Sequence, residues 1–161
     1  MALPVYIEIK GEKQGQFKGG CKRKGCENMI EAFWVSHEIK IPTDALTGKA
    51  AGNRIHGAIL FKKATDSATP QLYAALVNAE TITEMKMHFW QVDPKGVEKE
   101  FYTVVATDAQ VSQVVAELPD IYDHPQRKPA EMIAIRYSKI EWVIKDGNIM
   151  AEDDWYAPAR G

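Results

Sequence analysis

The 161-residue sequence predicts a mainly β fold, an antiparallel β-barrel of about eight strands with one short α-helix. Apolar and polar residues alternate over most of the chain, which is the period of half-buried strands. Turn sequences such as Asp93-Pro94-Lys95-Gly96 and Asp146-Gly147 join these stretches and favour antiparallel neighbours. Closing such a sheet removes exposed edges. At this length, with 45% hydrophobic residues, we expect a single domain spanning residues 1–161.

The N-terminal part predicts two strands separated by a basic loop. Residues 3–10 alternate with period two, and Ile30–Ile41 forms the next expected strand. The second strand has apolar residues on both faces, which suggests that the core covers one face and a helix or neighbouring subunit the other. Residues 11–28 are rich in glycine and lysine and indicate either a solvated loop or a contact surface for an acidic partner.

A long irregular connection follows from Ile41 to Gly57, with three glycines and two runs of small residues. Compact domains seldom place so many irregular residues between two strands unless the loop has a function. We therefore interpret the loop, about residues 41–54, as an arm that projects from the barrel.

The remaining elements follow in order. After a strand at Ile55–Ala64, a helix is expected at about 66–79, with Thr69 as N-cap and Pro70 at its first position. Further strands are expected at Thr81–Asp93, Val97–Asp108, Val111–Leu118, Glu131–Lys145 and Ile149–Trp155, with an irregular loop at Pro119–Pro129 and a tail that frays over 157–161.

The sequence offers no recognisable chemistry. The four histidines lack metal-ligand spacing, and GxSxG, P-loop and GxGxxG motifs are absent, so we expect no enzyme, cofactor or metal. A net charge of -2 does not favour nucleic acid. No run is long and apolar enough for membrane insertion, and the N-terminus lacks the apolar region of a signal peptide. We therefore expect synthesis in the cytoplasm.

Cys21 and Cys26 lie within the basic loop, in GGCKRKGC. Two free thiols, a disulfide between them and a zinc site that also uses His37 or His56 all remain open. Free thiols are the simplest interpretation. The acidic run Glu152-Asp153-Asp154 is expected to be a solvated strand end.

Several segments together resemble the haemolysin-coregulated protein (Hcp) family, the tube subunit of bacterial type VI secretion systems. They occur in family order across nearly the whole chain, although the two cysteines are not part of the family pattern. The matching stretches are PVYIEIKG, FKGG, SHEIKIPTDALTGKAAGNRIHG, ILFKKATDSATPQLYAAL and IRYSKIEWVIKDGNIMAEDDW.

This resemblance implies a barrel like that of phage tail-tube proteins, six subunits in a ring, and rings stacked into a hollow tube. It also implies expulsion by a contractile sheath, a lumen able to hold effectors, and sheath, spike and effector proteins as partners. A monomeric barrel that binds a small apolar ligand and a secreted effector are the alternatives.

A stacked ring needs a lateral contact that closes and an axial contact that does not. For the lateral contact we expect three aromatic residues that point away from the apolar face of their strands: Trp34, Trp90 and Tyr102. For stacking we expect the arm, with contacts from Pro42, Thr43, Asp44, Lys49, Asn53 and Arg54. Attraction between the basic region 10–24 and the acidic hairpin 146–154 is a further hypothesis.

Overall fold

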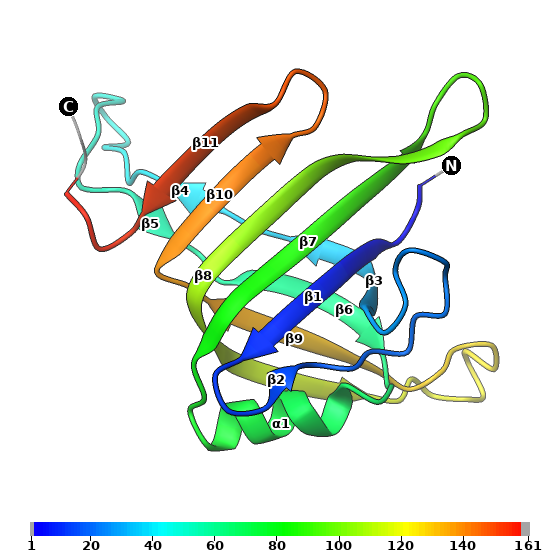
Figure 1. Cartoon of the computed structure of the whole chain (residues 1–161). Helices are drawn as coiled ribbons and strands as arrows, with labels where there is room; N and C mark the ends of the chain where they lie inside the picture. The colour runs from blue at the N-terminus through cyan, green and yellow to red at the C-terminus, as the bar shows by residue number, and fades with distance from the viewer. Residues whose placement is uncertain (1, 159–161) are drawn as a thin grey trace.

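The computed structural model describes residues 2–158 and has eleven strands and one helix in this range (Figure 1). Three of the strands are only two residues long, so the eight longer ones agree with the expected number. The elements are β1 (Val5–Gly11), β2 (Gly15–Gln16), β3 (Ile30–Ser36), β4 (Ile39–Lys40), β5 (Ile55–His56), β6 (Ile59–Ala64), α1 (Thr69–Val77), β7 (Ile82–Val92), β8 (Glu98–Glu117), β9 (Ala130–Arg136), β10 (Lys139–Ile144) and β11 (Ile149–Asp154).

The main sheet closes into an antiparallel barrel, as predicted. Its strands follow the order β11-β10-β8-β7-β1-β3-β6-β9, and β9 also pairs with β8. The pairing therefore runs from β8 through β7, β1, β3, β6 and β9 back to β8. The hairpin β10–β11 extends this sheet from the first half of β8, so β11 is an edge strand.

Strand β8 corrects one prediction, because residues 98–117 form a single strand and not two. Its first part pairs with β7 and β10, and its last part, from Gln110, pairs with β9. Asp108 lies at the change of partners with a φ of 50°. Asp108, where a strand was expected to end, is therefore a corner within a continuous strand.

The long strand expected at 131–145 is instead two strands, separated by Tyr137 and Ser138. β9 pairs with β6 and β8, whereas β10 pairs with β8 and β11. The backbone N–H of Ser138 donates to the carbonyls of Thr107 and Asp108. The two corners of the barrel wall are thus bonded to each other.

The strand expected at 30–41 is also shorter. β3 ends at Ser36, and Ile39–Lys40 is the separate β4, which pairs with β5. An irregularity in the β3–β6 register between Ala32 and Trp34 breaks the alternation. As a result Phe33 and Trp34 are both exposed, at 61% and 40%.

Helix α1 covers one end of the barrel (Figure 1) and is shorter than the predicted 66–79. Ala68 is the N-cap, and the Thr69 hydroxyl accepts a hydrogen bond from the Asp66 N–H before the helix begins. Ala79, with a φ of 49°, lies beyond its C-terminal end. Leu72 is fully buried under the barrel, a burial that typically contributes about 2 kcal/mol. Within residues 2–158, no helix has the length and apolarity needed to cross a membrane.

The barrel interior is filled by apolar side chains from all its strands, including Ile7, Ile59 and Met85. It also holds one buried ion pair. Lys63 and Glu131 lie directly opposite each other on β6 and β9, with their Nζ and Oε1 atoms 2.6 Å apart. Both side chains are almost completely buried, and the Lys63 ammonium group also lies 2.9 Å from the Asp66 carboxylate, so both carboxylates compensate its charge.

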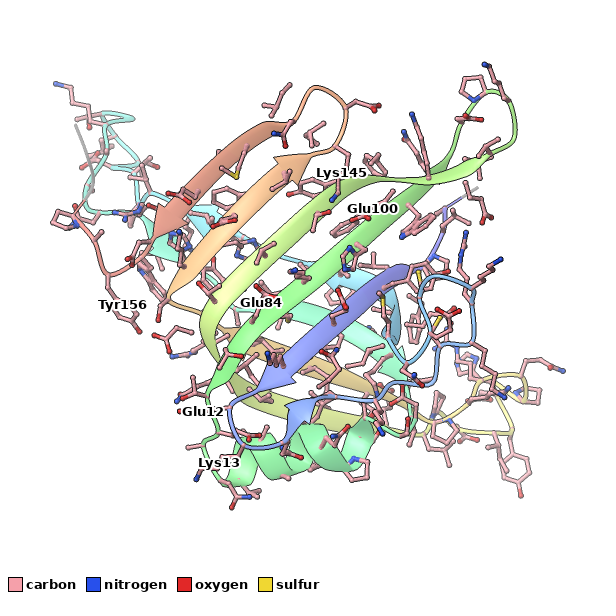
Figure 2. All side chains as sticks on the ribbon, viewed as in Figure 1. Glu12, Lys13, Glu84, Glu100, Lys145 and Tyr156 are labelled. Atoms are coloured by element: carbon pink, nitrogen blue, oxygen red, sulfur yellow. The ribbon has the colours of Figure 1, made fainter. Side chains whose placement is uncertain are left out.

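The outer face of the sheet formed by β1, β7, β8, β10 and β11 is polar. Figure 2 shows Glu84, Glu100 and Lys145 along this face. The His88 imidazole lies 2.7 Å from both the Glu8 and the Glu100 carboxylate, which come from neighbouring strands. Alternation along each strand places these charges outside and the methionines of β7 inside.

Candidate functional site

The predicted arm, about residues 41–54, is a projecting hairpin built on the short pair β4–β5 (Figure 1). Thr43 and Ala50 form an isolated β-bridge. The Asp44 carboxylate accepts hydrogen bonds from the N–H groups of Leu46 and Thr47 at 2.8 and 2.9 Å. These bonds lower the pKa of Asp44, the one from Thr47 most. The arm therefore has a defined shape of its own.

Nearly all of the arm is exposed. Residues 43–53 are exposed in every case, and Leu46 at the tip is 98% exposed. A fully exposed leucine contributes nothing to the packing of its own chain. The tip thus presents one large apolar side chain, flanked by the polar Asp44 and Lys49.

Arg54, expected among the stacking residues, instead binds the last strand of its own chain. Its Nε and Nη2 atoms lie 2.5 and 3.0 Å from the two carboxylate oxygens of Asp153. Nη2 also donates to the carbonyls of Asp154 and Ala157. Ala157, where the tail was expected to fray, is thus bonded to Arg54, and residues 159–161 lie outside the described range. These contacts anchor the base of the arm.

A buried network continues from Asp153 into the barrel corner. The His56 Nε2 lies 2.7 Å from an Asp153 oxygen, and its Nδ1 lies 2.6 Å from the Tyr137 hydroxyl. The same hydroxyl lies 2.8 Å from His37 Nε2. The Trp155 ring stacks on the His56 ring, with the two ring centroids 5.3 Å apart. We call Arg54, His56, Tyr137, Asp153 and His37 the clamp.

Several clamp residues have shifted pKa values. The hydrogen bond from Arg54 lowers the pKa of Asp153, and His56 lowers it further, against the opposing effect of burial. Burial lowers the pKa of His37, and the charge of nearby His56 adds to this. Burial raises the pKa of Tyr137 far above its usual value, so its hydroxyl stays protonated. The clamp is therefore organised around one carboxylate anion.

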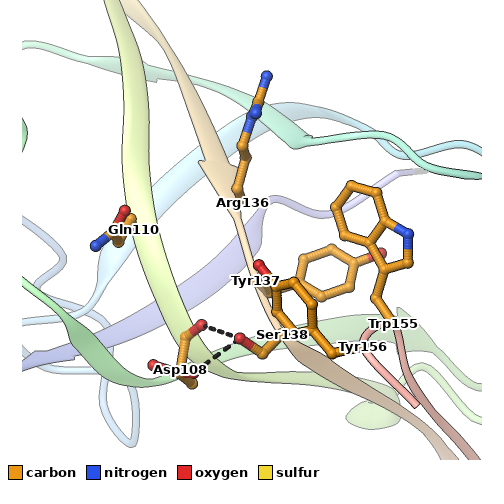
Figure 3. Close-up of a pocket in the computed structure, with 7 residues that line it drawn as sticks. All are labelled: Asp108, Gln110, Arg136, Tyr137, Ser138, Trp155 and Tyr156. Carbon is orange, nitrogen blue, oxygen red and sulfur yellow. Dashed lines mark hydrogen bonds between the residues drawn. The ribbon is translucent and has the colours of Figure 1, made fainter.

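An open recess of about 360 Å³ lies at the corner beside the clamp (Figure 3). Ser138 lines it, and its hydroxyl donates to the Asp108 carboxylate at 2.8 Å. Tyr156 borders the recess and is 79% exposed. The lining residues are Asp108, Gln110, Arg136, Tyr137, Ser138, Trp155 and Tyr156.

Trp34 lies in a second surface recess, of about 470 Å³, between β3, β6 and the 119–129 loop. The Lys62 ammonium group lies 5.0 Å from the Trp34 ring centre, and Phe33 is exposed next to it. Arg127 and Lys128 contribute to the rim. This recess is apolar with a basic border, and it leaves Trp34 available for a partner.

The other two aromatic residues predicted for the lateral contact are used within the chain. Trp90 packs against Tyr6 and the two cysteines. Tyr102 packs against the core, and its ring lies 5.1 Å from that of Phe89. Tyr102 shares a face with Val104 and Ala106, so the prediction that it points away from the apolar face is wrong. Whether Trp90 or Tyr102 touches another subunit stays a prediction.

The edge strand β11 offers a further surface. Its unpaired backbone edge lies next to Ile149 and Met150, which are 66% and 59% exposed. Exposed edges of this kind are templates for pairing with another chain. Asp146-Gly147 predicts the hairpin that ends in β11, but not the role of β11 as an edge strand.

Cys21 and Cys26 are both free thiols and both buried, in a small cluster with Tyr6, Met29 and Trp90. Burial raises the pKa of Cys26. Among residues 2–158, no group of three or more histidine, cysteine, aspartate or glutamate side chains is arranged to hold a metal ion. The loop around the cysteines is therefore folded onto the barrel by apolar contacts.

The clamp is the part of the site that sequence reasoning missed. Asp153 was expected to be solvated with its acidic neighbours, yet it is bonded to Arg54 and His56. The signal that Asp153 differs from its acidic neighbours was its position along the strand. Asp153 lies opposite the fully buried Ile140 in the β10–β11 register, whereas Glu152 and Asp154 on either side are exposed.

The chain matches known proteins along its whole length. Residues 6–143 match the family model described as type VI secretion system effector, Hcp. The chain is 29% identical to the "Major exported protein" of Pseudomonas aeruginosa, with both sequences covered completely.

Solved structures give the same result. The fold superimposes on a variant of Hcp1 from E. coli EAEC 042 with a TM-score of 0.86 and 32% identity, covering 96% of this chain and all of that one. It superimposes on the secreted protein Hcp3 of Pseudomonas aeruginosa with a TM-score of 0.81 and 25% identity, covering 97% of this chain and all of that one.

Proposed function

Because the chain belongs to the Hcp family of type VI secretion system proteins, we propose that it is a structural subunit of the inner tube of such a system. Six subunits form a ring, and rings stack into a hollow tube that a contractile sheath expels. The protein leaves the cell with the tube, whose lumen holds effectors. Sheath and spike proteins are its further partners. No catalytic role is proposed.

The observation that carries this proposal is the arm. The hairpin has its own hydrogen bonds and is held at its base by Arg54. Because residues 43–53 are exposed, it buries little surface and contributes little to the stability of the barrel. Such an arm is suited to reach a surface on another copy. We assign the contact between rings to Pro42, Thr43, Asp44, Lys49 and Asn53, with Leu46 added at the tip.

Arg54 has a different part in this proposal. Its guanidinium group is already bonded to Asp153 and two carbonyls of its own chain. It therefore sets the direction of the arm and does not itself form the contact. The lateral contact is assigned first to Trp34 and its recess, with Trp90 and Tyr102 as supporting residues beneath the surface.

Charge attraction between ring faces is a weaker part of the proposal. Lysines of the basic region 10–24, such as Lys10 and Lys24, are exposed. On the acidic side, Asp153 and Glu152 are already paired with Arg54 and Lys139. The other ion pairs that lysines of the 10–24 region could form with the 146–154 hairpin would be exposed to solvent and screened by salt. Tube formation that does not change with ionic strength would contradict this part alone.

The test is the assembly state of purified protein. Size-exclusion chromatography with light scattering should give a six-fold multiple of the 18.1 kDa chain, and negative-stain microscopy should show rings and stacked rings. A species of 18.1 kDa would contradict the proposal and favour a monomeric barrel that binds a ligand in the Trp34 recess.

A deletion variant tests the arm itself. Removing residues 43–52 leaves β4–β5 and the clamp in place, so the protein should fold but stack poorly. The matched control replaces Pro94 and Lys95 with alanine. These residues lie in the turn between β7 and β8, away from the arm (Figure 1) and outside the Trp34 recess. Long tubes of normal appearance from the arm deletion would refute the assignment.

A further inference from the structure

The loop that carries the two cysteines is folded tightly onto the outer face of β1. The Cys21 N–H donates to the carbonyl of Met29 at 3.1 Å, and the Met29 N–H donates to the carbonyl of Cys26 at 3.2 Å. The Cys26 N–H closes a turn on the carbonyl of Arg23 at 2.9 Å. A single residue, Met29, thus bonds to the backbone of both cysteines and brings them together.

The side chains meet in the same place. Cys21 and Cys26 belong to one buried cluster with Tyr6 and are 5% and 1% exposed. Arg23 lies above this cluster, 4.8 Å from the Trp90 ring and 5.5 Å from the Tyr6 ring. Burial raises the pKa of Cys26, and the charge of a Cys21 thiolate adds to this, so Cys26 stays a protonated thiol while the cluster is closed.

We propose that Cys21 and Cys26 are a modification site, a dithiol that closes to an intrachain disulfide when the protein meets an oxidising environment. The co-reactant is a small disulfide such as oxidised glutathione. One cysteine thiolate attacks it, forms a mixed disulfide and releases one glutathione thiolate. The second cysteine then attacks the protein sulfur and releases the other glutathione. The two protons of the cysteines end on the two released thiols.

The physical effect of the bond falls on the loop. Lys22, Arg23 and Lys24 lie between the two cysteines, and Lys22 and Lys24 are exposed. Reaction of the buried thiols, or cleavage within this segment, requires the apolar cluster around Tyr6 to open locally. A disulfide across it restricts the open states and so protects the segment from proteases outside the cell. The inference rests on the proposed function only for the place of oxidation, since export removes the chain from the reducing cytosol.

Peptide mapping tests the bond directly. The purified full-length protein is incubated with oxidised glutathione, its remaining thiols are alkylated, and it is digested with trypsin without reduction. Trypsin cuts after Lys22, Arg23 and Lys24, so the two cysteines separate into different peptides unless a disulfide joins them. The expected result is one linked pair that reduction splits into two. Separate peptides, each alkylated or carrying glutathione, would overturn the proposal, as would dimers linked through these cysteines.

Native proteolysis tests the effect on the loop. Oxidation should slow trypsin cleavage at residues 22–24 in the parent protein and leave the rate unchanged in a Cys21→Ser, Cys26→Ser variant. Equal cleavage before and after oxidation of the parent would overturn the protective role. The assembly state of the same samples is recorded by microscopy. A monomeric protein that forms the disulfide would contradict the tube proposal and support the disulfide proposal. Tubes that form without the disulfide would support the tube proposal and contradict the disulfide proposal.

Discussion

Arg54 and Asp153 form a bidentate ion pair that joins the base of the arm to the last strand of the sheet, across 99 residues of sequence. The geometry is that of a guanidinium group facing both carboxylate oxygens, which fixes direction as well as distance. The arm therefore leaves the barrel at an angle set by β11. We expect a substitution in β11 to alter the orientation of the arm, although the two segments are distant in sequence.

Replacing Tyr137 with phenylalanine should lower the stability of the clamp. The change removes the hydroxyl that lies between His37 and His56 and leaves both rings without this partner. We expect a loss of about 1–2 kcal/mol in the free energy of unfolding, measured by urea denaturation. The control is Tyr156→Phe, at an exposed position, which should leave stability unchanged. Equal stability of both variants would show that the hydroxyl bonds are unimportant.

Glu131→Gln should be more damaging. Lys63 is fully buried, and the substitution leaves its ammonium group with Asp66 as the remaining carboxylate. Breaking one side of a buried pair typically costs about 3–5 kcal/mol. Thermal unfolding measures the effect, and the exposed Glu117→Gln on β8 is the matched control. A Glu131→Gln protein as stable as the control would mean that the charge on Lys63 is satisfied without Glu131.

Stability should decrease as the pH falls below about 6.5, the ordinary pKa of the His37 side chain. Burial lowers the pKa of His37 in the folded protein, so the unfolded chain takes up the proton first and is favoured. The loss is complete once the pH lies below the folded pKa. Urea denaturation across this range should show a flatter profile for His37→Gln, and the parental profile for the exposed His124→Gln. Identical profiles for His37→Gln and the parent would exclude His37 as the source.

Leu46→Ser should weaken assembly without changing stability. The side chain is 98% exposed and packs against nothing in its own chain, so its removal cannot loosen the barrel. Sedimentation velocity should show fewer stacked species, while thermal unfolding matches the parent. Val97→Ser, at another exposed apolar position, in the turn between β7 and β8, is the control. An equal loss in both variants would mean that stacking depends on surface apolarity in general.

The fold was largely predictable because strand alternation and turn chemistry act locally. The same alternation contained two signals that were overlooked. Lys63 is in phase with Ile59 and Phe61, and Glu131 is in phase with Ile133 and Ile135, so both charges point inward. Two opposite charges on inward positions of neighbouring strands predict a buried pair, provided that the pairing of β6 with β9 is known.

Other features depend on contacts that no local pattern encodes. The corner at Asp108 keeps β8 continuous because β9 follows β10 along one edge of β8, where Arg136 pairs with Gln110 and Lys139 with Thr107, while the β7 pairing on the other edge ends at Ala109. The clamp depends on β5, β11 and the segment 137–138 meeting in space. The expected arm was found as a hairpin, yet its anchor, Arg54 on Asp153, joins residues whose proximity follows only from the finished topology.

The order of strands in the barrel also determines when the chain can finish folding. β6 cannot complete its strand pairing until β9 has been synthesised. The Lys63–Glu131 pair that joins them spans 68 residues. During synthesis the growing sheet therefore keeps an open edge until residue 136 has left the ribosome. Pairings between such distant segments form slowly, and an unfinished edge is prone to join a neighbouring chain. Newly made subunits, which are destined to associate, must avoid associating before their last strands arrive.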